Sequence, residues 1–90
     1  MLTQSFLKNL AAKAHKLRPV VLMGAKGLTE AVHQEIETAL VAHELIKIKL
    51  SAGDRESKQL MIEQIADLHE AVIVQQIGHV LVLYRANTDE

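Results

Sequence analysis

The sequence contains no cysteine and no tryptophan, one proline, and only two aromatic residues, Phe6 and Tyr84. Without cysteine it forms neither disulfides nor thiolate metal sites, which fits a reducing compartment. No apolar stretch is long enough to cross a bilayer, and the first residues lack the charged start and apolar run of a secretory signal. We therefore expect a cytoplasmic protein with no membrane partner and an aliphatic core.

Acidic residues are absent from the first third of the chain. Residues 1–29 carry no acidic side chain but five basic ones, Lys8, Lys13, Lys16, Arg18 and Lys26. Residues 30–90 hold the other five basic residues and all eleven acidic ones. This asymmetry favours a basic face that binds an anionic partner. Alternatively, the lysines simply keep one side of the first helix in water, and charge alone does not separate these interpretations.

The motifs of common catalytic and metal sites are also missing. The five histidines never pair at i and i+4 with a carboxylate between them, and there is no cysteine to complete a zinc site. The serines lack a nucleophile-elbow motif, and neither the P-loop nor the dinucleotide-binding glycine pattern is present. We therefore predict no enzyme activity, no metal, no cofactor and no small-molecule substrate.

Apolar periodicity predicts one α/β (α+β) domain over residues 1–86, followed by a short polar tail at 87–90. The order is α-β-α-β-α-β-β, in a four-stranded mixed sheet packed with helices. Strands joined through helices should be parallel, and the last two strands should form an antiparallel hairpin. The predicted elements are a helix up to Leu17, a strand at Val20–Met23, a helix at Glu30–His43, a strand at Leu45–Leu50, a helix at Arg55–Leu68, and strands at Ala71–Gln76 and Val80–Arg85.

Local signals also fix some helix boundaries and faces. The first helix should end at Arg18-Pro19, because a residue before proline is pushed out of the helical region. Asp54 or Ser51 can cap the third helix. The second helix should bury Val32, Ile36, Ala39 and Leu40, and the third should bury Leu60, Met61, Ile65 and Leu68.

The run from Gly24 to Thr29 (Gly-Ala-Lys-Gly-Leu-Thr) lies between a short strand and a long helix. Glycines at 24 and 27 free the backbone to turn sharply and let a polyanion approach closely. Thr29 is a good N-cap, so the orphan amides and positive dipole end of the next helix point towards the loop, where Lys26 adds a charge. The pattern resembles the GxxG backbone clamp of RNA-binding modules. A tight connection that binds nothing remains the alternative.

Other cations have two interpretations each. Lys47 and Lys49 share one strand face, either as its wet side or as a guard against edge pairing. Arg55, near the start of the third helix, is equally ambiguous, and Arg85 either anchors a phosphate or ends its strand. A sheet that stacks RNA bases needs exposed aromatic platforms, and this one offers at most Tyr84. We therefore expect RNA contacts to run through backbone amides and cations.

Several blocks of the chain together resemble a known family. They are Ala14-His15-Lys16-Leu17-Arg18-Pro19-Val20-Val21, the Gly24–Thr29 loop, His43-Glu44-Leu45-Ile46-Lys47-Ile48-Lys49, Gln76-Ile77-Gly78 and Leu83-Tyr84-Arg85. In this order they are similar to the CRM domain (chloroplast RNA splicing and ribosome maturation), in its stand-alone bacterial YhbY-type form. The resemblance covers nearly the whole chain.

The resemblance implies a fold similar to the C-terminal domain of bacterial translation initiation factor three. It also implies RNA binding through the loop and nearby basic residues. The residues predicted to bind are Gly24, Ala25, Lys26, Gly27 and Thr29, with Lys13, Lys16, Arg18 and Arg55. Stand-alone bacterial members are associated with precursors of the large ribosomal subunit.

We therefore predict a monomeric RNA-binding protein that binds ribosomal RNA and assists ribosome assembly. The alternative is a protein-interaction module that docks an acidic protein partner through the same basic face. Both need exposed lysines, so the sequence does not distinguish them.

Overall fold

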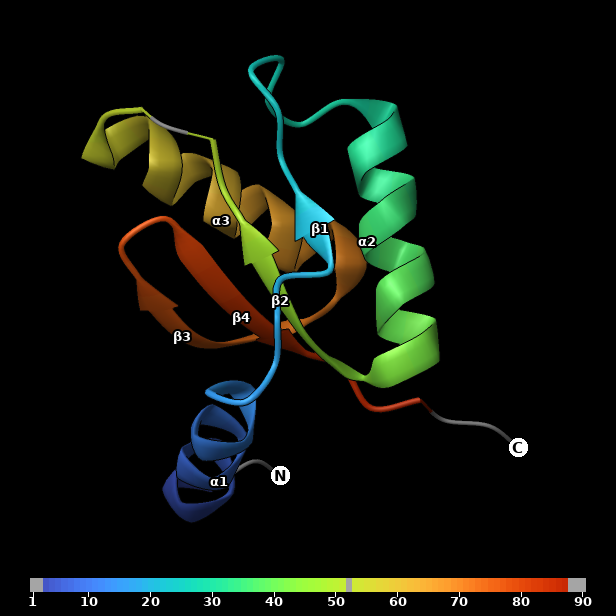
Figure 1. The fold of residues 1–90 in the computed structure, drawn as a ribbon, viewed down its shortest axis with the longest axis vertical. Helices are drawn as coiled ribbons and strands as arrows, with labels where there is room; N and C mark the ends of the chain where they lie inside the picture. The colour runs from blue at the N-terminus through green and yellow to red at the C-terminus, as the bar shows by residue number, and fades with distance from the viewer. Residues whose placement is uncertain (1–2, 52, 88–90) are drawn as a thin grey trace.

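The computed structural model describes residues 3–51 and 53–87, which form three helices and a four-stranded sheet (Figure 1). The elements in chain order are α1 (Gln4–Ala14), β1 (Val21–Leu22), α2 (Glu30–His43), β2 (Leu45–Lys49), α3 (Arg55–His69), β3 (Val72–Ile77) and β4 (Val80–Tyr84). The predicted order and the mixed sheet are confirmed. Within the two described ranges, no helix is long and apolar enough to cross a membrane.

The two longer helices begin at the residues that the sequence indicates. Thr29 Oγ1 accepts a hydrogen bond from the Val32 amide at 3.2 Å, and Asp54 Oδ1 accepts one from the Ser57 amide at 2.9 Å. Each side chain satisfies one of the first-turn amides, which have no partner inside the helix. Of the two candidate caps of α3, the structure uses Asp54 and not Ser51.

The first helix is shorter than predicted. It ends at Ala14, before the Arg18-Pro19 pair that was expected to stop it. The Leu17 amide then bonds the Ala14 carbonyl at 3.0 Å, three residues back, in a tighter turn than an α-helix makes. Because Pro19 keeps Arg18 out of the helical region, the chain unwinds through this turn before β1 begins.

The sheet has the strand order β1-β2-β4-β3. The β1–β2 pair is parallel, with Val21 opposite Ile48, and the other two pairs are antiparallel. β2 and β3 run in the same direction, as predicted for strands joined through a helix, but β4 lies between them. The hairpin from β3 to β4 is confirmed, and its turn uses Gly78 at φ +59°, a conformation that glycine adopts at little cost.

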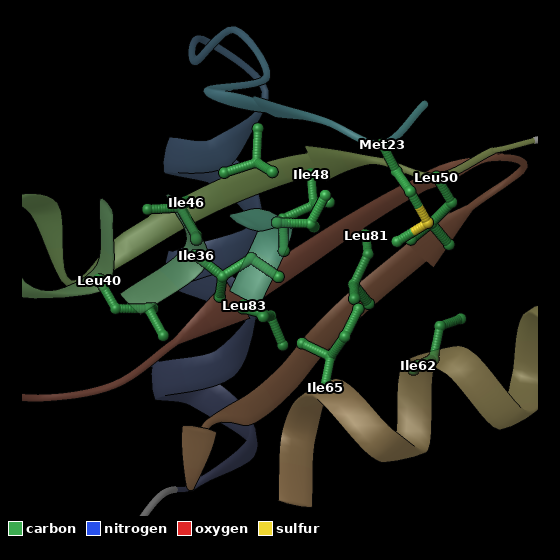
Figure 2. Packing of buried hydrophobic residues seen from close by; sticks show 12 residues of the cluster. Met23, Ile36, Leu40, Ile46, Ile48, Leu50, Ile62, Ile65, Leu81 and Leu83 are labelled. Atoms are coloured by element: carbon green, nitrogen blue, oxygen red, sulfur yellow. The ribbon is translucent and has the colours of Figure 1, made fainter. Parts of the chain in front are cut away.

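Aliphatic side chains from one face of the sheet and from α2 and α3 form the core (Figure 2). Strand residues contribute at every second position, which is the period of a pleated strand. The predicted stripe of α2 is confirmed, with Ala39 half-buried at its margin. Residues buried in this cluster are Val21, Met23, Val32, Ile36, Leu40, Ile46, Ile48, Leu50, Ile62, Ile65, Leu81 and Leu83.

The predicted buried face of α3 is partly wrong. Leu60 and Leu68 are 58% and 62% exposed, whereas Ile62 and His69 are buried together with the predicted Ile65. Ile62 lies two residues beyond Leu60, which is about 200° around a helix, so the two point in nearly opposite directions. The sequence offers apolar residues on both sides of α3, and a histidine occupies the position that completes the inner stripe.

α1 covers the other face of the sheet, where it contacts β2, β3 and β4. This layer is thin: Leu10 and Ala14 of α1 are buried, as is Val82 of β4. Phe6 and Leu17, which share the apolar spacing of α1, are 36% and 39% exposed. The single helix α1 therefore covers only part of its face of the sheet, whereas two helices, α2 and α3, cover the core face.

The chain leaves β4 beside the C-terminal end of α2. The Asn87 side chain donates a hydrogen bond to the Val41 carbonyl at 2.7 Å, and the Asn87 amide donates to the Glu44 carboxylate at 3.1 Å. Asn87 is therefore tied to α2 and the residue after it. The rest of the predicted tail, residues 88–90, lies outside the described residues.

Candidate nucleic-acid interface

The loop between β1 and α2 is a tight turn closed by its own backbone. The Gly27 amide donates to the Gly24 carbonyl at 3.0 Å, and the Thr29 amide donates to the Gly27 carbonyl at 3.1 Å. Gly27 has φ +75°, where a side chain would cause strain, while Gly24 does not have a positive φ. The turn geometry therefore requires only the second glycine, and what the first contributes is an open surface, since a Cβ there would meet nothing within 4 Å.

The tip of this turn is open to solvent. Gly24, Ala25 and Lys26 are all exposed. Within the described residues, the backbone amides of Ala25 and Lys26 donate no hydrogen bond. Directly behind them, α2 begins with its positive dipole end. Free amides, a helix N-terminus and a lysine together make a surface that can receive an anionic oxygen.

Two further connections lie at the same edge of the sheet. Because β1, β2 and β3 run in one direction, the loops after them gather where these strands end. Backbone hydrogen bonds join the segments: the Met23 amide donates to the Lys49 carbonyl at 2.8 Å, and the Leu50 amide donates to the His79 carbonyl at 2.7 Å. We call this side of the molecule the loop edge; it contains residues 24–29, 50–51, 53–55 and 78–79.

The loop edge carries both signs of charge. The predicted RNA-binding residue Arg55 is exposed there, one residue after the Asp54 cap. Lys58 Nζ donates to the Gly78 carbonyl at 3.2 Å, which fixes that lysine to the hairpin turn. Hydrogen bonds from the Ser57 side chain and amide lower the pKa of Asp54, so its carboxylate is a negative charge beside the cations.

Three predicted residues are not part of this edge. Lys13 lies in the last turn of α1, Lys16 follows that helix, and Arg18 precedes β1. Figure 1 shows α1 at one end of the long axis of the molecule and the loop after β1 at the other. The expectation that Lys16 and Arg18 are neighbours of the loop is therefore wrong.

The separation follows from how the chain runs beside β2. The Val20 amide bonds the Lys47 carbonyl at 3.0 Å and the Met23 amide bonds the Lys49 carbonyl at 2.8 Å, so residues 20–23 are extended along β2. An extended chain advances about 3.3 Å per residue. Arg18 and Gly24 thus lie at opposite ends of this segment.

Arg85 belongs to a polar cluster that the sequence does not reveal. Its guanidinium donates to both carboxylate oxygens of Glu37, at 3.0 and 2.8 Å, and also to the His69 carbonyl at 3.1 Å. His69 Nδ1 donates to the same carboxylate at 3.0 Å. These bonds join α2, the end of α3 and the residue after β4. Of the two interpretations of Arg85, the structure thus favours a structural one over a phosphate anchor.

The cluster extends to His33, whose Nδ1 lies 3.1 Å from His69 Nε2. When His69 is neutral and its Nδ1 proton points towards Glu37, its Nε2 accepts a hydrogen bond from His33 Nδ1. The hydrogen bonds from Arg85, and then from His69, lower the pKa of Glu37 to about 2. Burial, and then the neighbouring His69, lower the pKa of His33 from 6.5.

The two aromatic rings lie together, away from the loop edge. The ring centroids of Phe6 and Tyr84 are 5.6 Å apart and the ring planes meet at 78°, an edge-to-face contact. They connect α1 to the end of β4. Among the described residues, no group of three or more His, Asp or Glu side chains is placed to hold a metal ion.

Comparison with known proteins gives consistent matches along the chain. A sequence model of the CRS1 / YhbY (CRM) domain matches residues 2–85. A Haemophilus influenzae protein named "RNA-binding protein" is 54% identical over 86 residues, covering 96% of this chain and 84% of that protein. A "probable RNA-binding protein" of Pseudomonas aeruginosa is 37% identical over 86 residues, with 96% and 83% covered.

A solved structure confirms the fold. The solution structure of a hypothetical protein from Staphylococcus aureus has a TM-score of 0.84 and 28% sequence identity to this chain. The match covers 99% of this chain and 93% of the other.

Proposed function

The chain belongs to the CRS1 / YhbY (CRM) domain family, and on this basis we propose that it binds RNA, with the Gly24–Gly27 turn as the central contact. The observation that carries the proposal is the exposed turn whose amides precede a capped helix N-terminus. Phosphate oxygens accept hydrogen bonds from such amides, while Lys26 adds attraction. Relatives of similar length that are named for RNA binding support the same function.

The RNA that we propose is ribosomal RNA in precursors of the large subunit. This follows from the family resemblance, whose stand-alone bacterial members are associated with such precursors. The protein would act as a monomer in the cytoplasm and assist subunit assembly without catalysing a reaction. Its affinity would come from phosphate contacts at the loop edge and from the basic residues Lys13, Lys16 and Arg18.

The direct test replaces the tip of the turn. We expect Ala25→Asp/Lys26→Asp to abolish RNA binding and to leave the thermal unfolding midpoint unchanged, because both side chains are exposed. Binding of a single-stranded ribosomal RNA fragment is measured by fluorescence anisotropy. With about four phosphate contacts, the slope of log affinity against log salt should be near −3 for the unmodified protein, at about −0.7 per contact.

A charge-matched pair of variants separates the turn from general electrostatics. Lys26→Glu and Thr38→Glu/Gln64→Glu lower the net charge equally, but only the first changes the turn; Thr38 and Gln64 are exposed in the middles of α2 and α3. We expect Lys26→Glu to weaken binding much more than the control. Equal losses would mean that the turn is not a specific contact.

Sedimentation of a cell lysate tests the ribosomal part of the proposal. At low salt, the protein should migrate with the large subunit or with slightly lighter particles, and at high salt it should return to the top of the gradient. Ribonuclease treatment should release it from any captured proteins. A complex that survives the nuclease would favour an acidic protein partner instead.

A further inference from the structure

We propose that the cleft between α1 and the corner where α2 meets β2 holds one unstacked nucleotide of the bound RNA. The base would enter the cleft and the adjacent phosphates would contact its cationic rim. This inference rests on the proposed function, and it adds a base contact to an interface otherwise made of amides and cations. Residues of α1, of the segment that follows it and of the end of α2 line the cleft. Figure 1 shows these elements away from the loop after β1.

The cleft is large enough for this ligand. Its volume is about 590 Å³, which lies within the range of small-molecule sites. It exists because the helix that covers this sheet face is short and ends at Ala14. The segment from Leu17 to Val20 then forms one wall, while Leu45 and Lys47 of β2 form another.

Both aromatic residues of the chain line this one cleft. Phe6 remains 36% exposed although Tyr84 meets it edge to face at 5.6 Å. An unstacked base gains affinity by stacking on an aromatic face. In a chain with so few aromatic rings, their meeting at an open cleft is the observation that points to a base.

The charges at the cleft favour an anionic ligand. Lys13, Arg18 and Lys47 line it from α1, from the segment before β1 and from β2, against the single carboxylate of Glu44. That carboxylate accepts the Asn87 amide at 3.1 Å. Lys47 Nζ donates to the Leu17 carbonyl at 3.2 Å, which holds it at the wall of the cleft.

Lys13 and Arg18 are exposed and form no ion pair with any carboxylate in the described ranges. They are therefore available to phosphates on either side of the inserted nucleotide. The cleft therefore gives Lys13 and Arg18 a role in RNA binding, although both lie far from the Gly24–Gly27 turn. An apolar peptide would fill the cleft but would bring no charge for these cations.

The test compares a single-stranded RNA 12-mer with the same 12-mer made abasic, at equal salt. We expect the protein to bind the base-bearing RNA about tenfold more tightly, which is the order expected for one stacked base. Phe6→Leu, which keeps an apolar side chain, should remove most of this preference. Lys13→Gln/Arg18→Gln should weaken both RNAs. Lys26→Glu should also weaken both while leaving the preference for the base-bearing RNA unchanged.

Tyrosine fluorescence provides a local readout, because Tyr84 is the only tyrosine and the chain has no tryptophan. Quenching by base-bearing RNA, but not by abasic RNA, would support the inference. Binding of base-bearing RNA with no quenching and no effect of Phe6→Leu would overturn it and leave the proposed function intact. Failure of both RNAs to bind would overturn both. If sedimentation shows a dimer that Phe6→Leu disrupts, a second copy covers the cleft and the inference is wrong.

Discussion

The two faces of the sheet are built differently. The face towards α2 and α3 is filled by twelve buried aliphatic residues. The face towards α1 buries little beyond Leu10, Ala14 and Val82, and it includes the polar side chains of Lys47 and Gln75 beside cavities of about 590 and 170 Å³. One face therefore supplies most of the stability, and the other leaves space and charge for a ligand.

Matched leucine substitutions give the largest expected contrast between the faces. Leu83 is fully buried on the core face, and Leu10 is 5% exposed on the α1 face. We expect Leu83→Ala to lower the free energy of unfolding by about 4 kcal/mol and Leu10→Ala by about 2 kcal/mol, both within the range for buried leucines. The difference arises because water already reaches the cleft beside Leu10, so its truncation creates less enclosed void.

Urea denaturation followed by circular dichroism measures both variants. The slope of the unfolding free energy against urea concentration should be the same in both variants, so that a shift in the urea midpoint reports a change in stability. If Leu10→Ala costs as much as Leu83→Ala, the α1 face is packed as firmly as the core, and the distinction between the faces fails.

Features set by neighbouring residues were predictable from the sequence. The bounds of α2, its Thr29 cap and the turn at Gly78 depend on side chains and backbone angles only a few residues apart. The Asp54 cap of α3 is of the same kind. The directions of the strands were also predictable. The position of β4 between β2 and β3 was not, because packing across the whole chain decides the order of the strands.

Features that depend on distant partners were missed. His69 was not expected in the core, because its burial relies on Glu37, 32 residues away, and on His33, 36 residues away. Leu60 and Leu68 are apolar but lie outside the contact between α3 and the sheet. In the candidate site, the turn was found from its own residues, whereas the distance from Arg18 to that turn depends on how the chain runs beside β2.

The polar cluster at the margin of the core face should give the next largest effect. We expect Glu37→Gln to lower the free energy of unfolding at pH 7 by about 1 kcal/mol, because it removes the charge that Arg85 and His69 contact. The Glu37 side chain is 49% exposed, so solvent screens the pair and keeps the effect below that of a buried ion pair. Glu35→Gln, an exposed change on the same helix, is the control and should have no effect.

The pH dependence of stability tests the same cluster. Folding lowers the pKa of Glu37 from 4.5 to about 2, so the unfolded chain binds the proton more readily. The stabilisation from this carboxylate is therefore present above pH 4.5 and is lost as the pH falls towards 2. Thermal melts across this interval should show a smaller decline for Glu37→Gln than for the unmodified protein. An unchanged decline would mean that other groups cause it.

The smallest effect is expected for a polar residue on the α1 face. Gln75 is half-buried in β3 and lines the cavity of about 170 Å³, together with Ala14 and Val82. Gln75→Leu should change the free energy of unfolding by no more than about 0.5 kcal/mol in either direction, as for substitutions away from tightly packed sites. A leucine at this position has no amide group to hydrate, and it gains apolar contacts with side chains that line the cavity, such as Val82. Urea denaturation measures the stability of this variant as well. Leu81→Gln on the core face is the opposite exchange. We expect it to lower the free energy of unfolding by several kcal/mol, because the amide would be buried without hydrogen-bond partners. A large loss of stability for Gln75→Leu would show that the polar groups under α1 are themselves required for folding. The space beside them would then result from their hydrogen bonding and not from thin packing.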